Sequence, residues 1–293
     1  MLPVAAIALI TSTARAEEPA LEQQVTSIAA QIDGVVGVQA IDLRSGRRLS
    51  LNADQAFPMG SVYKFPLAIA VLSEVDRGKL RLDQKLTLEP SDFSRGHSPI
   101  RDHSQGKAVT MTLRRLIEAA VADSDNSAAD FLMRIAGGPQ RATAKIRNLN
   151  IEGIRIDRSE NEIGGSFDSP GGVASYAIDP RDTATPSAMA RLWELVMTNR
   201  EALRPASHRL LLSVLTRSKN PVRIARLLPG NLVVSHKTGT MPGTLNDTGA
   251  VSSRDGRHII VMAIFTRASS SSAEKRTAVV AEIASAIYQS FTH

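Results

Sequence analysis

The chain has 293 residues, of which 43% are hydrophobic and 22% are charged, close to the averages of globular proteins. This length can bury a large core and predicts one large domain or two closely packed ones. The absence of cysteine excludes disulfides, thiolate metal sites and a cysteine nucleophile. The net charge is +6, but Lys and Arg are scattered and only 4% of residues are aromatic, so we expect no nucleic-acid partner.

The first 16 residues have the pattern of a secretory signal peptide. An apolar run from Leu2 to Ile10 precedes Ala14-Arg15-Ala16, which fits an A-x-A cleavage site. No Lys or Arg precedes the run, so an apolar N-terminal helix packed on the protein is the alternative. The run is too short to span a bilayer. We expect cleavage after Ala16, a periplasmic or secreted protein, and no membrane partner after cleavage.

Hydrophobic periodicity predicts the elements that follow. Residues 18–32 are typical of an amphipathic helix, and residues 35–43 and 48–51 of a β-hairpin with its turn at 44–47. The middle of the chain is mostly helical, and the end returns to strands and a final helix. The helices are expected at 62–76, 112–121, 127–136, 139–148, 186–198, 206–217 and 273–290, and the late strands at 232–236, 247–253 and 257–265.

Strands at both ends and helices between them predict an α/β domain with an all-α domain inserted into it. We assign residues 17–57 and 218–293 to the α/β domain and residues 58–217 to the helical domain. A cleft between two such domains is a natural place for a ligand site. Nothing in the sequence indicates an oligomer, so we expect a monomer. None of the six histidines belongs to an HExxH or HxxEH pattern, so we expect neither a metal nor a cofactor.

Ser61-Val62-Tyr63-Lys64 opens the helix expected at 62–76. The spacing puts Ser61 and Lys64 on one face, at a first turn whose free N–H groups favour developing negative charge. A desolvated lysine can take the proton of a serine hydroxyl and make it a nucleophile. The alternative is an N-capping serine followed by an unrelated lysine. A second S-x-x-K, from Ser272 to Lys275, is interpreted in that way, as a solvated helix start.

Two further polar clusters are weak signals by themselves. The S-D-N run at 124–126 lies between two helices, where it could face a cleft or cap the helix that begins near Ser127. The K-T-G-T run at 237–240 follows the strand from Leu232. Its lysine and hydroxyls can hold a carboxylate, and its glycine lets a ligand approach the backbone. The alternative there is a strand end that runs into a turn.

S-x-x-K, S-D-N and K-T-G in this order form the motif set of the penicillin-recognising serine enzymes. From about residue 20 to its end the chain resembles class A β-lactamases. Glu160 resembles the general base on their omega loop, here about 158–182, and Arg158 and Asp182 match the pair that closes this loop. The resemblance implies the β-lactamase/transpeptidase-like fold, an antiparallel sheet flanked by helices.

The resemblance also implies a serine enzyme that hydrolyses the β-lactam amide of penicillins and cephalosporins and confers resistance. Ser61 would be the nucleophile, Lys64 and Glu160 the candidate bases for acylation, and Glu160 the base for deacylation. Ser124 would pass a proton to the ring nitrogen, and the backbone N–H groups of Ser61 and Thr240 would form the oxyanion hole. The substrate-binding residues would be Asn126, Lys237, Thr238, Gly239, Thr240, Arg223 and His97.

The chain departs from the family pattern in three places. Gly164 stands where members commonly have an asparagine, and His97 replaces an aromatic residue. The segment Gly165 to Asp179 is long, which suggests an enlarged or more mobile wall. The lack of cysteine excludes a disulfide typical of many carbapenem-hydrolysing members, which weakens the case for carbapenem hydrolysis without excluding it. Thr240, Arg223 and the long loop lead us to expect an extended spectrum that includes oxyimino cephalosporins.

Two alternatives share the three motifs. A peptidoglycan D,D-peptidase, or penicillin-binding protein, deacylates β-lactams poorly, and Glu160 argues against it. A β-lactam sensor or peptidoglycan-binding module would acylate without turnover, and the sequence shows no transmembrane segment or second domain to carry a signal.

Overall fold

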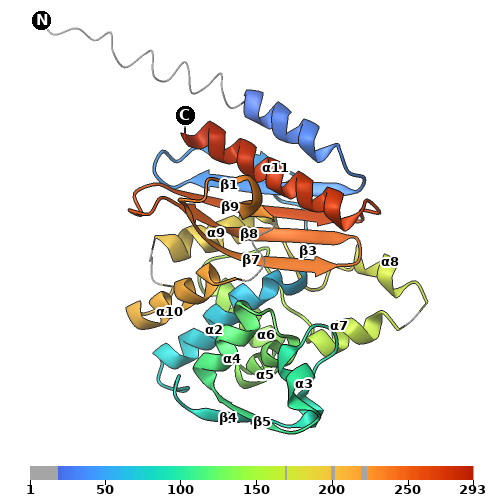
Figure 1. The fold of residues 1–293 in the computed structure, drawn as a ribbon, viewed down its shortest axis with the longest axis vertical. Coiled ribbons are helices and arrows are strands. Elements are labelled where there is room, and N and C mark those ends of the chain that lie inside the picture. The colour runs from blue at the N-terminus through green and yellow to red at the C-terminus, as the bar shows by residue number, and fades with distance from the viewer. Residues whose placement is uncertain (1–18, 169, 199–201, 219–222, 293) are drawn as a thin grey trace, which may run out of the picture.

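The structure is a computed structural model that describes residues 19–168, 170–198, 202–218 and 223–292, so the expected signal peptide lies outside the described residues. Its centre is a five-stranded antiparallel sheet in the order β2-β1-β9-β8-β7. The two ends of the chain meet in this sheet, as predicted (Figure 1). Its strands are β1 (Val35–Asp42), β2 (Arg48–Leu51), β7 (Val233–Met241), β8 (Thr244–Ser252) and β9 (Ile259–Arg267).

Helices cover both faces of the sheet. Residues 19–29 form a helix that lies beside α11 (Ala273–Thr292) on one face, where both contribute to a buried apolar cluster (Figure 1). The larger cluster lies on the other face, around α2 (Lys64–Asp76). The helices that pack there are α4 (Leu113–Val121), α5 (Asn126–Ile135), α6 (Pro139–Arg147), α9 (Pro186–Met197) and α10 (Pro205–Thr216).

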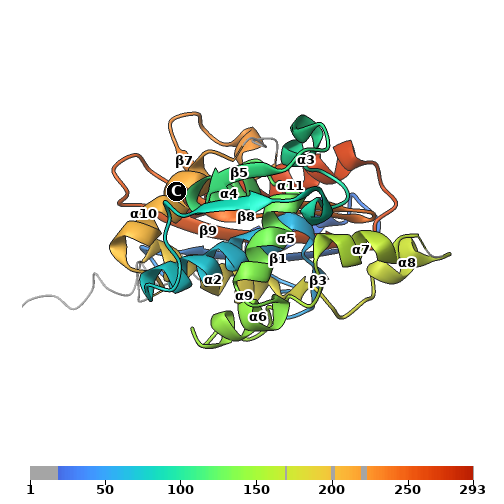
Figure 2. The same ribbon diagram turned by 90° about the horizontal axis from the view of Figure 1, so that it is seen from below.

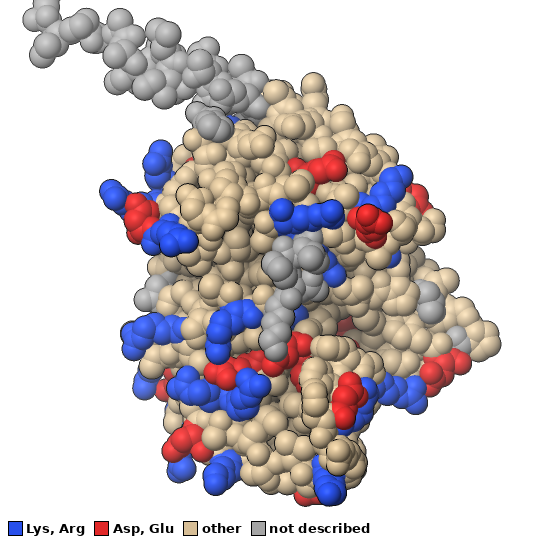
Figure 3. All heavy atoms as spheres, viewed as in Figure 1, with Lys and Arg blue, Asp and Glu red and all other residues tan. Residues whose placement is uncertain are grey.

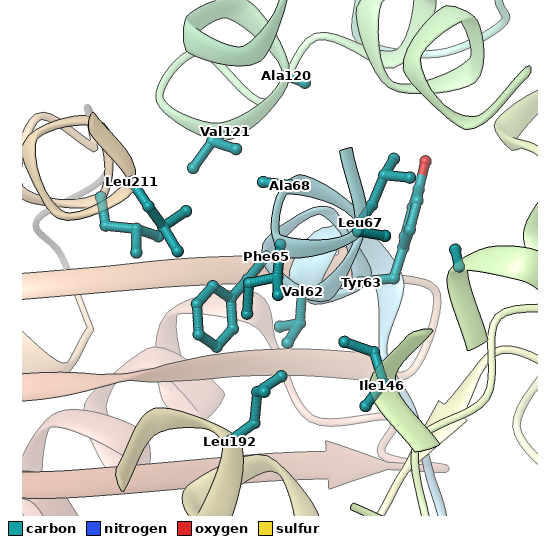
Figure 4. Close-up of a cluster of buried hydrophobic side chains, with 14 of the residues drawn as sticks. Val62, Tyr63, Phe65, Leu67, Ala68, Ala120, Val121, Ile146, Leu192 and Leu211 are labelled. Atoms are coloured by element: carbon teal, nitrogen blue, oxygen red, sulfur yellow. The ribbon is translucent and has the colours of Figure 1, made fainter. Parts of the chain in front are cut away.

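Helix α2 is the centre of the larger cluster because it is apolar on nearly every side. All its residues from Lys64 to Ser73 are buried, as expected for a helix without a polar face. Figure 4 shows side chains of α4, α9 and α10 gathered around Phe65 and Ala68. Trp193 of α9 stacks on Phe65, with ring centroids 4.2 Å apart, and its Nε1 donates a hydrogen bond to Thr248 Oγ1 of β8 at 3.0 Å. The helix that follows Ser61 is thereby fixed to the sheet.

The short elements were not predicted from the sequence. Two-stranded ladders join β3 (Phe57–Pro58) to β6 (Thr183–Ala184) and β4 (Lys85–Leu88) to β5 (Val109–Thr112). Helices α7 (Glu160–Ser166) and α8 (Gly172–Tyr176) lie together at one side of the molecule (Figures 1 and 2). The remaining elements are α3 (Pro99–Ser104) and 3-10 turns at Gly60–Tyr63, Pro90–Asp92 and Ile224–Leu227.

Two predicted boundaries are wrong where the motifs lie. Ser61 belongs to the 3-10 turn Gly60–Tyr63, and the α-helix begins only at Lys64. The K-T-G-T run does not follow a strand end, because β7 remains paired with β8 as far as Met241 and Thr244. The predicted end at residue 236 was too early because the polar residues beyond it are buried against other polar groups, which interrupts the apolar pattern without ending the strand.

The helix α9 packs against β1, β8 and β9, although its residues fall in the range assigned to the helical domain. The division into two domains stays a prediction. On the face shown in Figure 3, Lys and Arg are interspersed with Asp and Glu. Within the described ranges, no helix combines the length and the hydropathy needed to cross a bilayer.

Candidate active site

A cleft of about 930 Å³ lies where β7 faces the segments that carry the first two motifs. Most of the predicted site residues line it, while Lys64, Gly239 and Arg223 lie behind its surface. The predicted residues in its lining are Ser61, His97, Ser124, Asn126, Glu160, Lys237, Thr238 and Thr240.

The turn that carries Ser61 is pressed against β7. A Cβ atom on Gly239 would lie 2.2 Å from Met59 O, so only glycine fits there. Gly60 has a φ of +50°, and a Cβ atom on it would lie 3.3 Å from Thr240 N. The close approach puts the Thr240 amide beside the turn of Ser61, which is the arrangement that a two-donor oxyanion hole requires.

Asn246 of β8 braces this turn and was missed in the sequence. Its Nδ2 donates to Pro58 O at 2.8 Å and to Met59 O at 3.1 Å, and its Oδ1 accepts from Thr266 N at 3.0 Å. The side chain is fully buried and uses its amide on both sides, as a buried polar group must. The sequence carries no signal for it, because Asn246 lies just before the predicted strand 247–253 and joins a strand only in the structure, where β8 begins at Thr244.

Lys64 connects three segments of the site. Its fully buried Nζ donates to Ser124 O at 2.7 Å and to Asn126 Oδ1 at 2.6 Å, and lies 3.3 Å from Glu160 Oε1. A buried ammonium is tolerated only with such partners. Lys64 therefore brings the S-D-N run and Glu160 to the helix that follows Ser61.

Lys237 approaches Ser124 from the opposite side. Its Nζ donates to Ser124 Oγ at 3.0 Å and to Thr238 O at 2.9 Å. Burial lowers the pKa of Lys237 well below the usual range of lysine, and the charge of Lys64 lowers it further. Ser124 has a φ of +57°, a left-handed conformation that is unusual for a residue other than glycine. In this conformation its carbonyl meets one lysine and its hydroxyl meets the other.

Both interpretations of the S-D-N run are correct for different residues. Asp125 is the N-cap of α5, because its Oδ1 accepts from Ala128 N at 2.8 Å. Ser124 and Asn126, on either side of it, contact the lysines. Asn126 also donates from Nδ2 to Arg95 O at 2.8 Å. His97 is exposed in the cleft lining, with its Nε2 2.9 Å from Asp123 O.

Glu160 is held at the start of α7 by a carboxylate that the motifs did not indicate. Asp130 of α5 accepts hydrogen bonds from Glu160 N at 2.7 Å and from Asn161 N at 3.1 Å. Burial raises the pKa of Asp130. The only signal in the sequence was one acidic residue among the apolar residues that follow Ser127 in this helix. Asp130 therefore fixes the backbone of Glu160 to the core.

The ends of the loop at 158–182 are joined as the sequence predicted. Arg158 Nε donates to Asp182 Oδ2 at 2.6 Å, and its Nη1 lies 3.2 Å from Asp179 Oδ2. Of this loop, only Glu160 lines the cleft among the described residues. The expectation of an enlarged or more mobile wall at residues 165–179 stays a prediction.

Arg223 lies behind β7. Its guanidinium donates to Gly239 O at 3.0 Å, to Asn246 O at 2.6 Å and to Thr240 Oγ1. Burial lowers the pKa of Arg223. Arg223 thus contacts the K-T-G-T run without lining the cleft. Within the described residues, no group of three or more His, Asp or Glu is arranged to hold a metal ion.

Comparison with known proteins agrees with this geometry. The model of the β-lactamase enzyme family matches residues 20–291. β-Lactamase L2 of Stenotrophomonas maltophilia is 33% identical over 288 residues, which cover 96% of this chain and 90% of the relative. Extended-spectrum β-lactamase PER-1 of Pseudomonas aeruginosa is 29% identical over 290 residues, 94% and 88% of the two chains. The chain therefore belongs to the β-lactamase enzyme family.

The solved structures narrow the class. An ancestral class A β-lactamase of Gram-negative bacteria matches with a TM-score of 0.82 and 36% identity, over 92% of this chain and all of that one. The protein is a class A serine β-lactamase, a hydrolase of the kind that confers antibiotic resistance. The predicted fold is confirmed. The two alternatives, a D,D-peptidase and a sensor module, are not favoured.

Proposed function

We propose that the protein hydrolyses penicillins and cephalosporins through an acyl-enzyme on Ser61. The observation that carries this proposal is the buried network in which Lys64 contacts Ser124, Asn126 and Glu160. Such a network can move a proton away from a hydroxyl and return it to a leaving group without contact with bulk water.

In the acylation step, Ser61 Oγ adds to the β-lactam carbonyl carbon. Two groups can accept its proton: Lys64, and Glu160 through a water. The N–H groups of Ser61 and Thr240 stabilise the negative oxygen. As the C–N bond breaks, Ser124 gives its proton to the ring nitrogen, and the Lys237 ammonium 3.0 Å from Ser124 Oγ stabilises the charge that develops there.

The substrate carboxylate is bound by Lys237, Thr238 and Thr240. Gly239 leaves the backbone open to the ligand, and Arg223 adds positive charge behind Thr240. Asn126 binds the side-chain amide of the substrate, and His97 lies at the rim of the cleft. No metal or cofactor takes part in this mechanism.

Deacylation is assigned to Glu160, which activates water to hydrolyse the ester. We expect the parent protein to turn over a chromogenic cephalosporin many times. Glu160→Gln should give a single stoichiometric burst and a stable adduct in the mass spectrum, because the amide cannot accept the proton of water. The control is Glu162→Gln two residues further along α7, whose side chain accepts from Ser159 N in the capping box.

The outcomes distinguish the alternatives. A single burst from the parent protein would identify it as a D,D-peptidase or a sensor. Full turnover by Glu160→Gln would contradict the assignment of the deacylating base.

The substrate range is proposed to be extended. Two similar proteins are named extended-spectrum β-lactamases. One is PER-1, and the other is TLA-3, whose crystal structure matches this chain with a TM-score of 0.85 and 26% identity. The volume of the cleft and the Arg223–Thr240 contact support the same range here. Efficient turnover of benzylpenicillin without turnover of an oxyimino cephalosporin would contradict the extended range. A carbapenem included as a third substrate in the same kinetic experiment tests whether carbapenems are hydrolysed.

We further propose that the protein acts as an exported monomer without a nucleic-acid partner. Cleavage after Ala16 predicts a mature chain that begins at Glu17 in the periplasm or outside the cell. The N-terminal sequence of the protein recovered from the periplasmic fraction tests the export and the cleavage site. The sedimentation coefficient of the same protein tests the monomer.

A further inference from the structure

Tyr63 carries a polar atom that the mechanism does not use. Its side chain is 2% exposed, and its hydroxyl is buried without a well-formed hydrogen bond to any described residue. The ring belongs to the apolar cluster around α2, and in Figure 4 the hydroxyl points away from Val62 and Phe65. Phenylalanine would fill the same space without the cost of burying an unpaired hydroxyl, so the oxygen calls for an explanation.

Glu160 has the complementary feature. Its Oε1 is also buried without a well-formed hydrogen bond, although Lys64 Nζ lies 3.3 Å away. The same Nζ atom lies 6.0 Å from the centroid of the Tyr63 ring, so the phenol and the carboxylate border one ammonium group. Gly164, one turn further along α7, has no side chain that could reach Oε1.

Several charges surround the phenol. Burial raises the pKa of Tyr63, and the charges of Glu160 and Asp130, the carboxylate of Glu160 as a hydrogen-bond acceptor, and the charge of Asp182 raise it further. A phenol that stays protonated over the working pH range can only donate to a carboxylate. The titratable groups that interact with Glu160 from the elements around it are Lys64, Tyr63, Asp130, Tyr176 and Lys237, and Asp182 acts on both tyrosines.

We infer that Tyr63 is a positioning residue whose hydroxyl donates a hydrogen bond to the Glu160 carboxylate and holds it in place for the deacylation step. Active-site hydrogen bonds are often long or misaligned in a free enzyme and shorten when substrate binds, so the open geometry seen here is compatible with this role. The inference rests on the proposed role of Glu160 in deacylation.

The test is the pH dependence of the deacylation rate in Tyr63→Phe. Without the donor the ionised carboxylate is less stable, so the acidic limb of the profile should move to higher pH by about one unit. The matched control is Tyr176→Phe. Tyr176 of α8 is also buried, and its hydroxyl also lacks a well-formed hydrogen bond, but its nearest hydrogen-bonding group is the backbone of Gly60. The acidic limb of the deacylation profile should therefore not move in Tyr176→Phe.

An acidic limb at the parent position in Tyr63→Phe would overturn the inference, as would an equal shift in both variants. Glu160→Gln distinguishes a wrong role for Tyr63 from a wrong role for Glu160. If Glu160→Gln traps the acyl-enzyme while the acidic limb of deacylation in Tyr63→Phe does not move, only the role of Tyr63 is wrong.

A second measurement does not depend on the folding of Tyr63→Phe. The chain has three tyrosines, so 3-fluorotyrosine gives three fluorine signals, and Tyr176→Phe and Tyr288→Phe assign them by elimination. The Tyr63 signal should shift with pH along the acidic limb of deacylation, and this shift should disappear in Glu160→Gln. A Tyr63 signal that titrates identically in both proteins would overturn the inference.

Discussion

Two of the regions that line the cleft, here called the nucleophile wall and the loop wall, are held in different ways. The nucleophile wall, formed by the turn Gly60–Tyr63 and β7, depends on close backbone packing at Gly239 and on the buried amide of Asn246. The loop wall, formed by Glu160 and the loop at 158–182, depends on the buried carboxylate of Asp182 and the half-buried carboxylate of Asp130, which accept hydrogen bonds from guanidinium and backbone groups. Shape therefore holds the nucleophile and the two amides of the oxyanion hole, whereas charge and hydrogen bonds hold Glu160, the group assigned to deacylation and one of the two candidate bases for acylation.

This difference predicts that the two walls fail in different steps of the reaction. A packed backbone cannot yield without moving its neighbours, so added volume in the nucleophile wall should affect formation of the acyl-enzyme. A buried charge that loses its partner is destabilised at once, so a neutralised carboxylate in the loop wall should affect hydrolysis of the acyl-enzyme.

The largest effect is expected from Gly239→Ala. The added Cβ atom would lie 2.2 Å from Met59 O, so β7 must move away from the turn of Ser61 and carry the Thr240 amide with it. Loss of one oxyanion donor costs about a hundredfold or more in rate. Stopped-flow measurement of the acylation burst should show this loss. The control is Gly165→Ala in α7, where the added atom meets only open space. Acylation of Gly239→Ala at the parent rate would contradict the role given to shape.

The next effect is expected from Asp182→Asn in the loop wall. Asp182 accepts from Arg158 Nε at 2.6 Å and from the N–H groups of Asp157 and Arg158. The neutral amide leaves Arg158 with Asp179 as its remaining carboxylate, which should lower the free energy of unfolding by about 3 kcal/mol, measured in urea. Because Glu160 is displaced with the loop, deacylation should slow by about tenfold. Acylation should slow less, because Lys64 remains in place as the other candidate base for that step.

The control for this prediction is an exposed ion pair between Asp168 of the same loop and Arg95, which lies outside it. Arg95 and Asp168 form an ion pair in which both side chains are more than half exposed. Asp168→Asn should change the free energy of unfolding by less than about 1 kcal/mol and leave both rates unchanged. Equal effects of the two substitutions would show that the total charge of the loop, not its buried contacts, holds Glu160.

The sequence was sufficient for the large elements because their apolar residues repeat at the period of the structure they form. The helices around α2 were predicted to within one or two residues of their observed ends. The end of β7 was missed because Lys237 and the residues after it are polar, and the groups that bury them come from distant segments. The two-residue strands β3 and β6 are too short to show any period.

The site was predicted only as far as its motifs extend. Asn246 and Asp130 belong to no motif, yet one braces the turn of Ser61 and the other fixes the backbone of Glu160. Each is a single polar residue on a buried element, and its partner is far away in the chain. Asp130 lies in a predicted helix, so the sequence shows its place but not its partner. Asn246 lies outside the predicted strand 247–253, so the sequence does not show that it is buried. Only the tertiary fold brings each residue to its partner.

The smallest effect is expected from the charge of the nucleophile wall. Burial and the nearby Lys64 lower the pKa of Lys237, so it loses its charge at a pH below the usual range of lysine. The attraction for the substrate carboxylate is then lost as pH rises, and KM should rise by about fivefold in the alkaline range, the factor that corresponds to about 1 kcal/mol. In Lys237→Arg the guanidinium stays charged, so the rise should disappear. A KM of the parent protein that stays constant up to pH 10 would contradict this prediction. It would show that Lys237 keeps its proton in spite of its burial and of the nearby charge of Lys64.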